Sequence, residues 1–152
     1  MAEFEIRQEL PRHAVTIRKV VGNSEVAQAF GECLPKVFGY IQSKGGAMSG
    51  PPFGLYHSFS DDKMDMEAGL PVEAPVEGEG EITSTTLPGG RVAATWHVGP
   101  YEQLAQAHES LRRWVDEQGL RPAGPPRDVF WTDPGQEPDP SKWRTEVVLP
   151  VE

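Results

Sequence analysis

A glutamate in an apolar setting is the residue of this sequence best suited to do chemistry. Glu146 stands in the run Trp143-Arg144-Thr145-Glu146-Val147-Val148, and strand alternation would put it on one face with Val148. An ionised carboxylate among apolar side chains is costly to bury unless a positive charge pairs with it. That charge could come from a bound cation, or from an arginine such as Arg91 or Arg144. We carry forward the first interpretation, in which Glu146 binds a cationic ligand.

A second glutamate occupies the matching place in an earlier segment. Glu67-Ala68-Gly69-Leu70-Pro71-Val72 resembles Glu146-Val147-Val148-Leu149-Pro150-Val151, which lies 79 positions later. Asp65 on one side and the small residues that follow make the surroundings of Glu67 more polar and flexible. Glu67 is therefore expected either to face the same ligand from the other side or to be a solvated acid at a strand end.

Aromatic side chains exceed what one small core needs, so some are expected at a binding surface. An aromatic face attracts a flat cation by about 0.5 to 2 kcal/mol, and a tyrosine or tryptophan adds a directional hydrogen bond. Position in the sequence favours Tyr56 and Trp96, then Tyr101 ahead of the second predicted helix, and then Trp131. For each of these four, packing in the core is the alternative.

Other reactive side chains form no chemical pattern. His13, His57, His97 and His108 lack metal-ligand spacing, and Cys33 stands alone on an apolar helical stripe, which predicts a buried thiol. The sequence contains no Gly-x-Ser-x-Gly elbow, no Walker loop and no Gly-x-Gly-x-x-Gly motif. We therefore expect no metal, no cofactor and no nucleotide chemistry.

Composition and charge limit the partners. The 152 residues are 38% hydrophobic and carry a net charge of -9, as in an acidic globular domain. That charge repels phosphates, so nucleic acid and anionic membranes are not expected as direct partners, whereas a cationic or neutral partner fits better. No apolar run approaches the roughly 20 residues of a membrane helix, and no secretory signal is visible at the N-terminus, so a cytoplasmic location is expected.

An internal repeat predicts the elements that position these residues. Val26-Ala27-Gln28-Ala29-Phe30 and Leu104-Ala105-Gln106-Ala107-His108 lie 78 positions apart, each at the start of a helical pattern. A strand-like run precedes each helix. A Gly-Pro-Pro turn follows it, at Gly50 and at Gly124, and leads into an aromatic strand. The sequence therefore predicts two β-α-β-β units.

Each predicted helix carries an apolar stripe that should pack on its own sheet. Gly45 and Gly119 are expected just past the two helix ends, where a left-handed backbone is needed. Pro35 lies inside the first helix and predicts a kink or a break there.

The two units are expected to form a single domain over residues 1–152. Repeat 1 covers about 10–75, an acidic linker covers about 73–84, and repeat 2 covers about 85–152. Most of the negative charge lies around the linker, because residues 61–81 hold eight acids against Lys63 alone.

Four ordered motifs carry a family resemblance: Gly50–Tyr56, Met66–Val72, His97–Glu102 and Thr145–Val151. Together, over roughly residues 4–152, they resemble the GyrI-like domain, the effector-binding module of AraC-type and MerR-type multidrug regulators, which also occurs as a stand-alone protein. The resemblance implies an α+β fold. Its tandem β-α-β-β duplication has pseudo-twofold symmetry, and its two antiparallel sheets form a concave cleft with both helices outside.

The same resemblance implies a function. Members of this family bind lipophilic, often cationic molecules among aromatic side chains, with a glutamate at the position of Glu146. No helix-turn-helix segment is visible in the sequence. We therefore expect a stand-alone effector-binding protein that senses or sequesters amphipathic aromatic cations, alone or with a separate regulator or protein partner.

Two other functions stay open. The family resemblance extends to hydrolases of cyclopropane-bearing genotoxic natural products, for which Glu146 would be the general acid or base and Tyr56 or Tyr101 would assist. One family member restrains DNA gyrase. The acidic segment 61–81 could likewise serve a protein-interaction inhibitor of a gyrase-like target.

Overall fold

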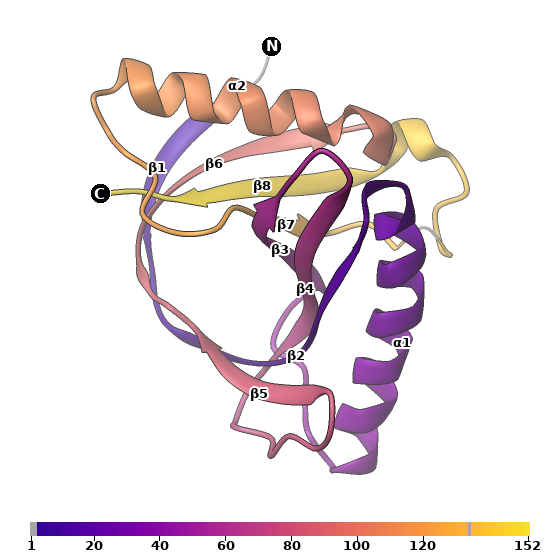
Figure 1. Ribbon diagram of the computed structural model, residues 1–152. Coiled ribbons are helices and arrows are strands. Elements are labelled where there is room, and N and C mark those ends of the chain that lie inside the picture. Colours follow the sequence, from indigo (N-terminus) through magenta and orange to yellow (C-terminus); the bar gives the residue numbers. More distant parts are fainter. Residues whose placement is uncertain (1–2, 134) are drawn as a thin grey trace. The chain divides into compact units, whose positions relative to one another are not determined.

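Two compact units make up the chain. The computed structural model describes residues 3–133 and 135–152, and it divides into unit 1, Met1–Glu9 with Gly90–Glu152, and unit 2, Leu10–Gly89 (Figure 1). Each unit packs one α-helix on antiparallel strands. The fold is therefore α+β, as the sequence predicts.

Unit 2 contains the first copy of the duplicated β-α-β-β arrangement. Its elements are β2 (Arg12–Gly22), the short 3-10 helix η1 (Asn23–Glu25), α1 (Val26–Ser43), β3 (Phe53–Phe59), β4 (Lys63–Val72) and β5 (Ile82–Leu87). The strands pair antiparallel in the order β3-β4-β2-β5. Branched and sulfur-containing side chains of β2 and β4 form the core with one face of α1, which includes Cys33. Cys33 is thus a buried thiol, as expected.

The helix α1 continues past its internal proline. The sequence predicts a kink or a break at Pro35, but one helix spans Val26–Ser43. Cys33 and Val37, on either side of the proline, are both buried. Burying this stripe outweighs the roughly 3 kcal/mol that an internal proline costs a helix. Beyond the helix, Gly45 has a φ of 70°, which confirms its predicted place at the helix end.

Unit 1 contains the second copy. Its elements are β1 (Phe4–Glu9), β6 (Gly90–Val98), η2 (Tyr101–Gln103), α2 (Leu104–Glu117), β7 (Arg127–Phe130), η3 (Pro140–Lys142) and β8 (Arg144–Pro150). The strands pair antiparallel in the order β1-β6-β8-β7, and α2 packs its Leu104, Leu111 and Val115 on β6 and β8. Within the described residues, neither helix is long and apolar enough to cross a bilayer.

The duplication includes one strand more per unit than the sequence predicts. β1 precedes β2 in the chain but pairs with β6, and β5 precedes β6 but pairs with β2 (Figure 1). The pairing is equivalent in both places, because Phe4 faces Thr95 and Ile82 faces Ile17. β1 and β5 are edge strands and are rich in polar residues. Because they lack the regular apolar alternation that marks a strand, the sequence did not predict them.

Each sheet has two unlike faces. One face holds the core under the unit's own helix, and the other, here called the distal face, points away from that helix. In unit 1 the distal face carries Glu146 and Val148, which stand opposite Trp96 and Ala94 on β6. Their shared face agrees with the alternation read from the sequence.

A buried hydroxyl supplies a test of the core under α2. Thr145 is fully buried, and its Oγ1 is the one buried side-chain polar atom of the described residues that has no hydrogen-bond partner. Thr145→Val should therefore raise the free energy of unfolding by about 1 kcal/mol in urea titrations, because an unpaired buried hydroxyl is replaced by a methyl group.

Thr95 is the matched control, since its equally buried Oγ1 donates to the Glu3 carbonyl at 2.7 Å. Thr95→Val should lower the free energy of unfolding. A loss of stability in both variants would contradict this description of Thr145.

Candidate functional site

Glu146 lies in the middle of the distal face of unit 1. It sits on β8, directly opposite Trp96 on β6 and Val129 on β7, and is only 5% exposed. Val92, Ala94 and Val148 form a small apolar cluster on the same face, with Val129 packed against it. A charge in this position needs a partner.

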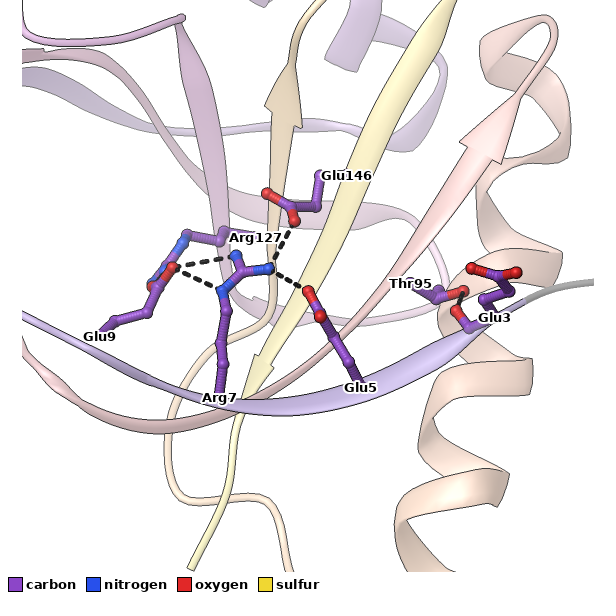
Figure 2. Close-up of polar contacts among 7 residues, drawn as sticks. All are labelled: Glu3, Glu5, Arg7, Glu9, Thr95, Arg127 and Glu146. Atoms are coloured by element: carbon purple, nitrogen blue, oxygen red, sulfur yellow. Dashed lines mark hydrogen bonds and ion pairs between the residues drawn. The ribbon is translucent and has the colours of Figure 1, made fainter.

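That partner is Arg7 of β1. Its Nη1 donates to Glu146 Oε2 at 2.7 Å and to Glu5 Oε1 at 2.6 Å, while its Nη2 donates to Glu9 Oε2 at 3.0 Å (Figure 2). Since β6 lies between β1 and β8, the arginine side chain reaches over one strand to make the contact. Burial of Arg7 works against its charged form, but the hydrogen bonds to Glu146 and Glu9 outweigh this and raise its pKa.

An arginine thus pairs with Glu146, which was one of the two sources of positive charge left open from the sequence. The arginine is Arg7, and neither Arg91 nor Arg144, which were the examples named there. Arg144 instead places its guanidinium over the ring of Trp96, 4.9 Å from the centroid. The alternation Glu5-Ile6-Arg7-Gln8-Glu9 was a usable signal, because period two places three charged side chains on one face of a strand.

A second ion pair extends the network along β1. Glu9 also accepts a hydrogen bond from Arg127 of β7, and both side chains are largely buried. Arg127 stands opposite Val148, so it shares the distal face with Glu146. Alternating acids and arginines thus bridge the strands β1, β7 and β8 over one apolar face (Figure 2).

Two of the expected aromatic residues flank Glu146. Trp96 and Trp131 lie with ring centroids 6.0 Å apart and are 38% and 53% exposed. Such exposure is high for tryptophan in a folded domain. The structure therefore brings Glu146, Trp96 and Trp131 together, and it adds Arg7 and Arg144.

The two expected tyrosines lie elsewhere. Tyr101 packs against the core under α2, with Phe130 at 5.7 Å and Trp143 at 4.9 Å between ring centroids, and burial raises the pKa of its hydroxyl. Tyr56 belongs to the core under α1, where its ring meets Phe30 edge-on. Neither is on the distal face with a glutamate of its own unit.

Glu67 lies beside a threonine and a histidine. It lies on the distal face of unit 2, is nearly buried, and accepts a hydrogen bond from Thr16 Oγ1 at 2.5 Å. His57 Nε2 lies 2.7 Å from its other oxygen. Glu67 is thus not the solvated strand-end acid that was one of its two expected roles. A bulge in β3 beside Tyr56 turns His57 toward it, and no period-two pattern reveals such a bulge.

Histidine, cysteine and acidic side chains do not gather into a metal site in the part of the chain that the structure describes. The described residues contain no group of three or more histidine, cysteine or acidic side chains that could hold a metal ion. His108 Nε2 lies 2.7 Å from Asp128 Oδ1 and ties α2 to β7 on the opposite face from Glu146. The arrangement of unit 1 is suited to binding: a buried carboxylate, two half-exposed indoles and the three arginines Arg7, Arg127 and Arg144 lie on one face.

A family model matches nearly the whole chain. The model of the GyrI-like small molecule binding domain matches residues 2–152. No curated protein matches the chain at a significant level.

Solved structures share the fold. The C-terminal domain of EcmrR is 23% identical with a TM-score of 0.89, covering 100% of this chain and 98% of that one. In the EcmrR–DNA complex the likeness has a TM-score of 0.89 at 22% identity and covers 99% of this chain but 57% of that chain. This chain thus spans little more than half of that EcmrR chain.

Two further structures are relevant. SAV2435 bound to tetraphenylphosphonium is 15% identical with a TM-score of 0.71, covering 99% of this chain and 94% of that one. A hydrolase encoded by lin2189 from Listeria innocua is 16% identical with a TM-score of 0.68, and the likeness covers 99% of this chain and 92% of that one. At these identities the likenesses show a common fold.

The Arg7–Glu146 pair predicts an asymmetric effect on stability. Arg7→Met leaves a nearly buried carboxylate without its cation and should lower the free energy of unfolding by about 2 kcal/mol or more. Glu146→Gln should cost about 1 kcal/mol or less, because Arg7 keeps Glu5 and Glu9. Urea titrations at pH 7 compare the two variants. A larger loss for Glu146→Gln would contradict the pairing.

Proposed function

Since the chain belongs to the family of GyrI-like small molecule binding domains, we propose that the distal face of unit 1 binds lipophilic aromatic cations. The observation that carries the proposal is the position of Glu146, a buried carboxylate directly opposite the half-exposed Trp96. Aromatic surface and negative charge side by side are what such a cation requires.

Binding would combine stacking with charge neutralisation. The rings of Trp96 and Trp131 present π faces, each worth about 0.5 to 2 kcal/mol toward a cation. Glu146 supplies the opposite charge in an apolar setting, where an electrostatic attraction is stronger than in water. Stacking on an aromatic ring places few demands on ligand shape, so such a site accepts varied aromatic cations, as multidrug binding requires.

The structural relatives support this choice of ligand. SAV2435 has the same fold and was solved with tetraphenylphosphonium, an aromatic cation. The EcmrR C-terminal domain is part of a longer protein that was solved with DNA. By analogy we propose that this chain senses or sequesters its ligand, either alone or with a separate regulator.

Tetraphenylphosphonium is the probe for this proposal. Titration into the wild-type protein should quench tryptophan fluorescence, and Glu146→Gln should weaken binding about tenfold or more, because a charge-assisted contact is lost. Glu67→Gln is the matched control, since Glu67 occupies the repeat position of Glu146 in unit 2. Equal weakening by both substitutions, or no quenching of wild type at high micromolar concentration, would refute the proposal.

Hydrolysis of cyclopropane-bearing natural products is the second candidate. The His57–Glu67 pair favours it, because a carboxylate that orients an imidazole is a common general-base arrangement. A structural relative from Listeria innocua is described as a hydrolase. In this reading Glu67 orients His57, which is the general base of unit 2. Glu146 of unit 1, the acid or base expected from the sequence, is the alternative to it.

Mass spectrometry separates the two candidates. Incubation of the protein with a cyclopropane-bearing alkylating agent should yield a product heavier by one water, and His57→Gln should abolish its formation. If product forms at an unchanged rate with His57→Gln but not with Glu146→Gln, then Glu146 is the acid or base of the reaction. Absence of product with wild-type protein would remove the hydrolase candidate.

A further inference from the structure

We propose that Arg7 and Arg144 act as internal competitors of the ligand: each occupies a recognition group, and a cation binds by displacing them. The inference rests on the proposed function and adds a rule of selectivity to it. Arg7 holds the carboxylate of Glu146, and Arg144 lies over the π face of Trp96. These are the two contacts that an aromatic cation would itself make.

Arg7 is arranged so that it can release Glu146 at low cost. Its guanidinium already contacts Glu5 at 2.6 Å and Glu9 at 3.0 Å, in addition to Glu146 at 2.7 Å. After displacement from Glu146 it keeps two carboxylate partners on its own strand (Figure 2). Its side chain is 30% exposed and that of Glu5 is 57% exposed, so solvent also reaches the released guanidinium.

Arg144 is held more lightly. It is an exposed residue at the start of β8, and its guanidinium contacts Trp96 face-on. A cation–π contact at an exposed site is weak, and a larger aromatic cation that stacks on the same ring can replace it. Displacing Arg144 therefore opens the indole that stands opposite Glu146.

Competition by two guanidinium groups selects for large apolar cations. A small cation such as tetramethylammonium brings charge, but it donates no hydrogen bonds and has little apolar surface. It therefore cannot replace an arginine, which brings both charge and hydrogen bonds. Tetraphenylphosphonium brings apolar surface that gains from burial against Trp96 and Trp131. The state with arginine in place is closed to ligand, so the observed affinity is reduced by the fraction of molecules in that state.

Calorimetric titration of tetraphenylphosphonium tests the inference. Four proteins are compared: the wild type, Arg7→Met, Arg144→Met, and Arg113→Met as the control. Arg113 is exposed on α2, so its removal changes the net charge equally but outside the distal face. We expect about tenfold tighter binding for Arg7→Met, a smaller gain for Arg144→Met, and no change for Arg113→Met.

Arg7→Lys is a second variant that tests the inference even if Arg7→Met fails to fold. Lysine keeps the charge but lacks the forked donors that hold Glu146 and Glu9 together, so this variant should bind tetraphenylphosphonium more tightly than wild type. Suppose that the wild type binds the probe, and that Arg7→Lys and Arg144→Met bind it as weakly as the wild type or more weakly. The arginines are then not competitors of the ligand, and the inference fails while the proposed function stands. If none of the folded proteins binds the probe, the proposed function fails together with it.

Discussion

The ion pair between Arg7 and Glu146 is the interaction on which the distal face of unit 1 depends. It joins an edge strand at one end of the sequence to β8 near the other, across the intervening β6. A carboxylate that is 5% exposed among Val92, Ala94 and Val148 would be unstable as an anion without it. The same pair holds the Glu146 carboxylate on the face where a cation would bind.

The duplication explains why the two units hold their glutamates differently. Glu67 and Glu146 occupy equivalent strands, and β5 pairs in unit 2 as β1 pairs in unit 1. At the position that Arg7 has in β1, however, β5 has Thr85. Glu67 is consequently held by Thr16 and His57 instead of by an arginine. One scaffold thus presents an ionic site in unit 1 and a hydrogen-bonded acid in unit 2.

The repeated β-α-β-β plan could be predicted from the sequence because its signals are local and occur twice. Glu146 also stands out locally, as an acid in an apolar strand. Its partner does not, since Arg7 is 139 positions away and lies on a polar edge strand. Tyr56 was expected beside the ligand, but strand register puts it under α1, and the adjacent bulge brings His57 to Glu67 instead. Long-range register and bulges are tertiary features that local periodicity does not encode.

A crystal structure of the protein with tetraphenylphosphonium tests the central claim most directly. The account predicts the phosphonium within about 6 Å of the Trp96 ring and beside the Glu146 carboxylate. It also predicts that the Arg7 guanidinium has left Glu146 and remains bound to Glu5 and Glu9. A cation seated away from Glu146, or one bound while the 2.7 Å contact between Arg7 and Glu146 stays intact, would contradict it.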